Sequence, residues 1–193
     1  MIEKTKNLLV ACLTLIALGS CVGNGEKAEE TDASADSIAL ADSMAEAVPQ
    51  LNQVAGTVGE GTSMHSLELL LGDGNSMYFF YENNAIGGIS AGDEVSVTYD
   101  KIEGELTAIN IVNLTALTHL WKVEGQNQHL EINSKGRLTT YGMKDAYNKW
   151  TIAENQIILS GNQLTDTLGI QLLTADSLII ANENKSFIMS KEN

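Results

Sequence analysis

Cys21 is the residue whose type and position carry the clearest chemical consequence. It closes the tetrapeptide Leu18-Gly19-Ser20-Cys21, which lies at the end of an apolar run that begins at Leu8. A thiol ionises to a soft nucleophile near neutral pH more readily than any other side chain. The small residues before it leave the preceding peptide bond accessible. The pattern therefore predicts a reactive thiol at an accessible position directly after the apolar run.

The segment before Cys21 predicts export from the cytoplasm. Lys4 and Lys6 precede the apolar run, and positive charge followed by apolar and then small residues is the order of a secretory signal peptide. The run is about 11 residues long, whereas a membrane-spanning helix needs about 20. We expect a signal peptide over residues 1–20.

The tetrapeptide at 18–21 resembles the lipobox of bacterial lipoproteins. The resemblance implies that diacylglycerol is attached to the Cys21 thiol and that the chain is cleaved directly before Cys21. It also implies that the amino group of Cys21 released by this cleavage is acylated. Each buried methylene contributes about 0.8 kcal/mol, so several chains on one residue would anchor the protein to a membrane. We therefore expect a lipid-anchored protein of the bacterial cell envelope, held at the outer membrane. Cys12 lies in the leader and no other cysteine is present, which excludes disulfides and thiol redox chemistry in the mature chain.

The charge of the chain restricts its partners. The formal net charge is −14, and residues 51–115 carry nine acids against Lys101. Nucleic acid and a bare anionic membrane surface would both be repelled. Residues 22–50 are acidic and contain no aromatic residue, so they bury too little apolar surface to offset the entropy of ordering. We expect a flexible acidic tether over residues 21–50.

Few side chains form a pattern typical of catalysis or metal binding. Met64, His65 and Met77 could offer soft ligands to copper(I), but packing of Met64 and solvation of His65 is the expectation that we favour. His119 is expected to be a solvated linker residue. The sequence has no nucleophile elbow, phosphate-binding loop or dinucleotide fingerprint. We predict no enzymatic activity, no metal and no cofactor.

Residues 51–115 alternate apolar and polar side chains, which is the pattern of half-buried strands. Val95 and Val97, for example, alternate with Glu94 and Ser96. The segment MYFFYE at 77–82 is aromatic on both faces and predicts a central strand. The expected strands are 53–60, 64–72, 76–82, 94–100 and 105–113.

Turn residues connect these strands. Asp73-Gly74 and Glu103-Gly104 predict tight hairpins, because glycine adopts positive φ at low cost. Five strands with a longer connection after the third is the plan of an OB-fold. We expect an OB-like β-barrel over residues 51–115.

Residues 116–193 repeat the strand pattern at shorter spacing, with turns at positions such as Gly125 and Gly161. Eight short strands are expected, at 118–124, 127–133, 136–141, 146–152, 155–160, 165–173, 176–182 and 185–190. This spacing is typical of an up-and-down barrel or a strongly curled sheet. The whole protein is thus predicted to be all-β, with two small antiparallel domains.

The second module resembles the lipocalin-like domain of cell-envelope lipoproteins from gut Gram-negative bacteria. The resemblance covers residues 117–190, and the features that carry it are Trp121, Gly136-Arg137-Leu138, Gly142-Met143, Trp150, IILSG at 157–161, DTLGI at 166–170 and DSLII at 176–180. It implies a lipocalin-like barrel or half-barrel over 116–193. An OB-like module beside such a barrel is similar to the copper-linked NlpE type of outer-membrane lipoprotein, but here the order is reversed and the CxxC motifs are absent.

An aromatic set in this second module is the candidate ligand site. Its members are Trp121, Tyr141, Tyr147 and Trp150. A lipocalin-type barrel can hold one small apolar ligand if side chains do not fill its interior, and core packing of both tryptophans is the alternative. We predict a non-enzymatic binding module for a small apolar ligand, a glycan or an envelope protein. An envelope stress or copper sensor of the NlpE type is the other hypothesis.

Overall fold

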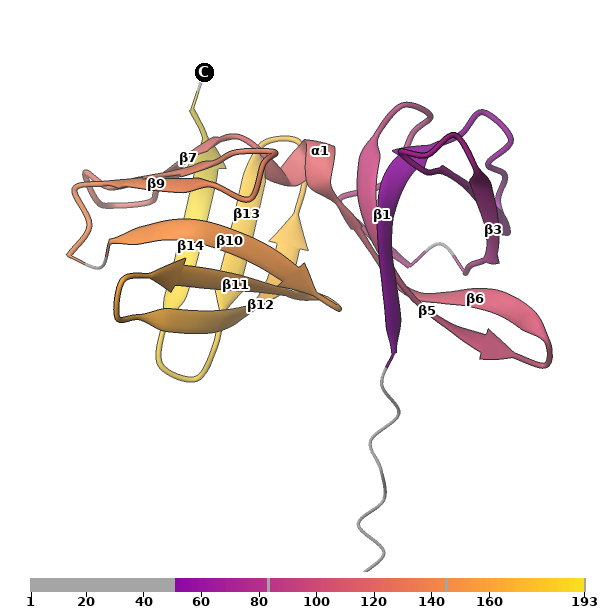
Figure 1. Ribbon diagram of the computed structural model, residues 1–193. Coiled ribbons are helices and arrows are strands. Elements are labelled where there is room, and N and C mark those ends of the chain that lie inside the picture. The colour runs from indigo at the N-terminus through magenta and orange to yellow at the C-terminus, as the bar shows by residue number, and fades with distance from the viewer. Residues whose placement is uncertain (1–50, 83, 145, 193) are drawn as a thin grey trace, which may run out of the picture. The chain divides into compact units, whose positions relative to one another are not determined.

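The computed structural model describes residues 51–82, 84–144 and 146–192, and Figure 1 shows their arrangement. The leader, Cys21 and the acidic tether lie outside these residues. The described chain is all-β and contains a closed five-stranded barrel and a nearly closed eight-stranded antiparallel barrel. The expectation of two small barrels in an all-β chain is therefore confirmed. No helix in this part of the chain is long and apolar enough to cross a membrane.

The first barrel is a five-stranded sheet that closes on itself. Its strands are β1 (Asn52–Val58), β2 (Ser66–Leu70), β3 (Ser76–Phe80), β5 (Glu94–Ile102) and β6 (Glu105–Asn113). They are hydrogen-bonded in the order β3-β2-β1-β5-β6, and a parallel pairing of Phe80 with Thr107 joins β3 to β6. Closure removes the unpaired strand edges that would otherwise invite pairing with other chains.

Alternation of side chains explains why these strands form a barrel. On β2, Leu67 and Leu69 are fully buried while Glu68 between them is not, and Phe79 of β3 is also buried. The buried core is completed by Val58, Tyr81, Val95, Val97, Ala108 and Ile111.

The hairpin turns form where glycine predicts them. Gly74 has φ 85°, and its neighbour Asp73 accepts a hydrogen bond from the backbone N–H of Asn75 at 3.0 Å. Glu103 and Gly104 both have positive φ, at 53° and 94°. Both sequence-based turns are thus confirmed.

The third strand differs from its expected place at the centre of the sheet. β3 pairs with β2 along its whole length but meets β6 at a single residue pair. Tyr78 and Phe80 are 58% and 43% exposed, so only one face of this aromatic strand is buried. The prediction of a central strand is wrong, because β3 lies at the end of the sheet order and closes the barrel through that single pair. The connection after β3 also contains a short strand, β4 (Ala85–Ile86), parallel to β6.

The second barrel is a meander of eight strands. They are β7 (Leu120–Val123), β8 (His129–Ile132), β9 (Leu138–Tyr141), β10 (Tyr147–Ala153), β11 (Gln156–Gly161), β12 (Thr165–Leu173), β13 (Ser177–Ala181) and β14 (Ser186–Lys191). The last strand pairs with the first, and the sheet ends at β9 and β10. A bridge between Arg137, the residue before β9, and Lys149 of β10 links these two ends.

A one-turn helix, α1 (Leu114–Leu117), precedes the second barrel and was not expected from the sequence. The side chain of Asn113 caps it by accepting a hydrogen bond from the N–H of Ala116 at 2.9 Å. Leu117 is fully buried in the core of the second barrel. The helix thus fixes the entry into β7.

His119 is not the solvated linker residue that the sequence predicts. Its ring is half-buried, meets Trp121 edge-on at 5.9 Å between ring centroids, and lies 3.3 Å from Nζ of Lys191. Burial, together with the Lys191 ammonium, lowers the pKa of His119. The prediction failed because α1 and β14 bring packing partners to this position.

Two leucines on β2 test the assignment of inner and outer faces. We expect Leu67→Ala to lower the free energy of unfolding by about 2–5 kcal/mol, since a fully buried leucine leaves a cavity. Leu70→Ala, on the same strand but 41% exposed, should change it by less than about 0.5 kcal/mol. Urea denaturation of both variants measures the difference, and equal effects would contradict the assigned faces.

Candidate functional site

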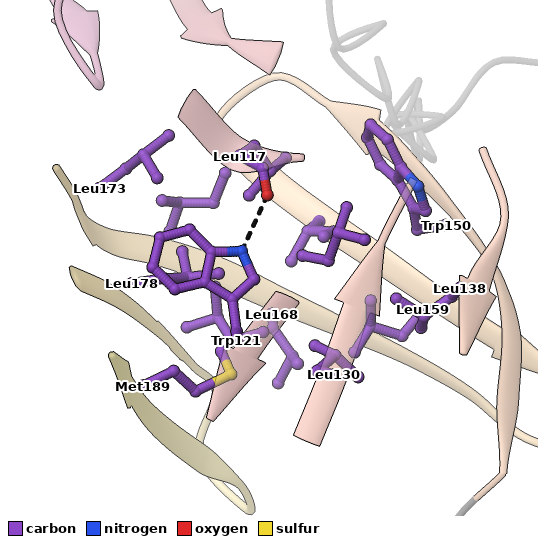
Figure 2. Packing of buried hydrophobic residues seen from close by; sticks show 14 of the residues in the cluster. Leu117, Trp121, Leu130, Leu138, Trp150, Leu159, Leu168, Leu173, Leu178 and Met189 are labelled. Atoms are coloured by element: carbon purple, nitrogen blue, oxygen red, sulfur yellow. Dashed lines mark hydrogen bonds between the residues drawn. The ribbon is translucent and has the colours of Figure 1, made fainter. Parts of the chain in front are cut away.

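The interior of the second barrel is filled by its own side chains. Trp121 is fully buried, and its indole N–H donates a hydrogen bond to the carbonyl of Leu117 at 2.9 Å. Figure 2 shows this indole among Leu130, Leu178 and Met189. The hydrogen bond satisfies the one polar atom of the ring, so Trp121 has the environment of a packing residue.

Trp150 and Tyr141 have different surroundings from each other. Trp150 is 6% exposed, and its indole N–H donates to the carbonyl of Asn133 at 2.8 Å. Tyr141 is 48% exposed, and its hydroxyl donates to the Glu131 carboxylate at 3.0 Å. That hydrogen bond raises the pKa of Tyr141. The aromatic set predicted from the sequence is therefore divided between the core and the outer surface.

Tyr147, the fourth member, belongs to a polar cluster that ties β10, β12 and the turn before β14 together. Its hydroxyl donates to Asp166, and Lys185 Nζ lies 2.7 Å from Asp166 Oδ2 and 3.0 Å from the Tyr147 hydroxyl. The Lys185 ammonium and then the Tyr147 hydroxyl lower the pKa of Asp166. Burial and the hydrogen bond to Asp166 raise the pKa of Tyr147. The cluster holds strands together and exposes no free nucleophile.

The residues considered for copper do not come together. Met64 is 75% exposed, so the expectation that it packs is wrong; His65 faces solvent as predicted. Met77 lies opposite Leu69 on the inner face of the β2–β3 hairpin and packs against the core of the first barrel. It is therefore separated from His65, which precedes β2. Within residues 51–82, 84–144 and 146–192, no three His, Cys, Asp or Glu side chains are grouped to hold a metal ion.

The outer wall of β2 and β3 carries a built cluster that sequence reasoning missed, and we call it the aromatic face. It consists of His65, Glu68, Tyr78 and Phe80. The register places Glu68 opposite Tyr78 and Ser66 opposite Phe80. The His65 ring stacks on Phe80 at 6.3 Å between centroids, with 15° between the ring planes. Two exposed rings thus lie two residues apart on one strand, with a carboxylate beside them.

Glu68 fixes the geometry of the aromatic face. Its Oε1 accepts a hydrogen bond from the Tyr78 hydroxyl at 2.8 Å, and its Oε2 accepts one from the backbone N–H of Gly61 at 2.7 Å. Gly59 lies so close over this carboxylate that a Cβ at that position would collide with Glu68 Oε2. The bond to Glu68 raises the pKa of Tyr78. One side chain therefore orients both a ring and the β1–β2 turn.

A groove of about 400 Å³ is formed by the β1–β2 turn and the connection that follows β4. Its lining includes Glu60, Ser63, Met64, Tyr81 and Ser90. The Tyr81 hydroxyl donates to the carbonyl of Ser63 at 2.9 Å, which holds one wall in place. Since His65 directly follows Met64, the groove and the aromatic face share the β1–β2 turn.

The exposed pair could have been found from the sequence by one further step. Tyr78 and Phe80 share one face of an alternating strand, and Phe79 shares the other with Leu67 and Leu69. Once one face is assigned to the core, the other aromatic residues must be outside.

Comparison of the chain with models of known families, with curated proteins and with solved structures gives no match.

The pH dependence of stability tests the cluster around Asp166. A carboxylate whose pKa is lower in the folded state stabilises the fold above its unfolded pKa, about 3.9, and this stabilisation is lost as pH falls through the folded value. We expect Asp166→Asn to lower Tm at pH 7. The decrease should be about 2–4 °C for each kcal/mol by which the free energy of unfolding falls. The difference from the wild type should shrink as pH falls below about 4.

Asp176→Asn is the matched control, because Asp176 is exposed and makes no ion pair with the described residues. Differential scanning calorimetry between pH 2 and 7 measures all three proteins. A Tm difference for Asp166→Asn that stays constant over this range would contradict the ionic role of Asp166.

Proposed function

We propose that the protein is a lipid-anchored, non-enzymatic binding protein of the bacterial cell envelope, and that its ligand is a glycan bound on the aromatic face. The observation that carries the proposal is the exposed pair Tyr78 and Phe80, held beside the Glu68 carboxylate. Aromatic rings at the surface cost free energy in water unless a ligand covers them. These two are oriented by fixed contacts before any ligand arrives.

The strand order supports an OB-type assignment for the first barrel and a lipocalin-type assignment for the second. In OB barrels the face of strands 2 and 3 and the loop between strands 1 and 2 bind oligonucleotides or oligosaccharides. The aromatic face and the groove occupy the corresponding elements, β2, β3 and the β1–β2 turn. The net charge of −8 over residues 51–115 disfavours a nucleic acid there.

A glycan fits the chemistry of this face. Pyranose rings present apolar C–H surfaces that can lie flat on an aromatic side chain, and their hydroxyl groups donate hydrogen bonds to carboxylates. Tyr78 and Phe80 supply the flat surfaces, and Glu68 supplies acceptor oxygens. A small apolar ligand inside the second barrel is less well supported, because Trp121 and its neighbours fill that interior.

The envelope location rests on the leader and Cys21. Acyl chains on Cys21 would hold the chain at the outer membrane, and the acidic segment up to residue 50 would separate the barrels from the lipid surface.

Isothermal titration calorimetry with neutral hexasaccharides tests the glycan site. We expect the full-length protein in detergent to bind cellohexaose or the N-acetylglucosamine hexamer, and Tyr78→Ala/Phe80→Ala to weaken binding at least about tenfold. Stacking of a base on an aromatic side chain is worth about 1–3 kcal/mol, and a loss of about 1.4 kcal/mol is tenfold in affinity.

Tyr141→Ala is the control for the glycan experiment. Tyr141 is also an exposed tyrosine hydrogen-bonded to a glutamate, but it lies on the second barrel. Binding that survives loss of Tyr78 and Phe80, or that depends equally on Tyr141, would refute the assignment of the site. Absence of binding to both hexasaccharides would refute a neutral glycan as the ligand.

Membrane fractionation tests the anchor. We expect Cys21→Ala to move the protein from the membrane pellet to the soluble fraction, and Cys12→Ala in the leader to leave it in the pellet. Mass spectrometry of the mature wild-type chain should find an acylated Cys21 as the first residue. A Cys21→Ala protein that stays in the pellet would contradict lipidation as the means of attachment.

A further inference from the structure

We infer that the glycan recognised on the aromatic face carries positive charge and is an oligomer of an amino sugar with free amines. This inference rests on the proposed function, and it adds the charge of the ligand. It is carried by the placement of carboxylates around the two rings and by the absence of lysine and arginine from the strands that bear them.

The two exposed rings of the first barrel lie in a negative electrostatic potential. Residues 51–115 contain nine acids and Lys101 as their single lysine or arginine. Lys101 lies near the tip of the β5–β6 hairpin, opposite Leu106, and β1, β2, β3 and β6 carry no lysine or arginine. A ligand approaching the aromatic face therefore meets negative potential, which attracts cations and repels anions.

The strand register brings carboxylates to the same outer wall as the rings. Phe80 pairs with Thr107, and Thr107 pairs with Asp100, so Asp100 lies on the same cross-strand row as Phe80. Glu68 lies opposite Tyr78. Glu82 is exposed and lies two residues beyond Phe80, just after the end of β3.

These carboxylates are not neutralised within the described chain. The ion pairs formed by residues 51–82, 84–144 and 146–192 include none to Glu68, Glu82 or Asp100. The contacts that Glu68 and Asp100 do make are hydrogen bonds from neutral donors: Tyr78 and Gly61 to Glu68, and the backbone N–H of Lys101 to Asp100. Their charge is available to a ligand.

Aromatic rings and carboxylates together favour one type of glycan. A protonated amine is attracted to the negative face of a tyrosine or phenylalanine ring and forms charge-assisted hydrogen bonds with carboxylates. A glucosamine-type unit combines that amine with an apolar ring face on the same sugar. An oligomer repeats the pair of groups, so neighbouring units can engage Tyr78 and Phe80 while their amines face Glu82 and Asp100.

Three hexasaccharides of different charge test the inference on the full-length protein in detergent. They are the β-1,4-linked glucosamine hexamer, its fully N-acetylated form and the galacturonate hexamer. At pH 6 and about 50 mM NaCl we expect calorimetry to give at least about tenfold higher affinity for the glucosamine hexamer than for the N-acetylated form. Raising the salt to about 500 mM should reduce this preference to less than about threefold, because exposed charges are then screened.

Two charge-removing substitutions identify the residues responsible. Glu82→Gln/Asp100→Asn should abolish most of the preference for the amine while leaving affinity for the N-acetylated hexamer within about twofold. Glu131→Gln on the second barrel is the matched control and should leave the preference unchanged. Retained preference in the Glu82→Gln/Asp100→Asn protein would overturn the inference.

The outcomes separate this inference from the proposed function. The glucosamine hexamer and its N-acetylated form could bind with equal affinity, and Tyr78→Ala/Phe80→Ala could abolish the binding of both. That result would overturn the charge inference and leave the glycan site intact. Tighter binding of the galacturonate hexamer would also overturn it. Failure of every hexasaccharide to bind would overturn the proposed function, and the inference with it.

Discussion

Burial of alternate side chains inside a closed sheet is the constraint on which the rest of the structure depends. Each barrel is small enough that its own residues fill the interior: Phe79 with the leucines of β2 in the first, and Trp121 with its neighbours in the second. A filled barrel is stable but has no room for a guest. The proposed glycan site accordingly uses an outer wall, where every second side chain lies outside the core.

One carboxylate shows how an outer wall can be made rigid without a core. Glu68 lies between two buried leucines on β2, and its two oxygens accept hydrogen bonds from a ring hydroxyl and from a turn. A loop and a side chain that would otherwise sample many conformations are thereby fixed in one arrangement. A ligand bound at the proposed site would therefore cost less conformational entropy, which is the usual benefit of preorganisation. The same tyrosine–glutamate pairing occurs at Tyr141, where no second exposed ring lies on β9.

Much of the fold was predictable because strand alternation and turn residues are local signals. The hairpins at Gly74 and Gly104 formed as expected, and the eight strands of the second barrel lie within a few residues of their predicted bounds. Long-range packing escaped prediction. His119 became half-buried only because β14 returns to it, and α1 formed where a linker was expected. The candidate site was only partly predictable, since aromatic content identifies residues of interest but not the face on which a closed sheet places them.

The seam between β9 and β10 is the junction of the second barrel with the fewest strand pairings. Every other neighbouring pair in that sheet is joined by a ladder, whereas these two ends are linked by the bridge between Arg137 and Lys149. Two cations face each other there, and like charges opposite one another weaken a pairing. Transient opening would begin at this junction and uncover the side of the core that contains Trp150. Trp121 belongs to β7, which is paired with β14, so opening at the seam would leave this indole buried.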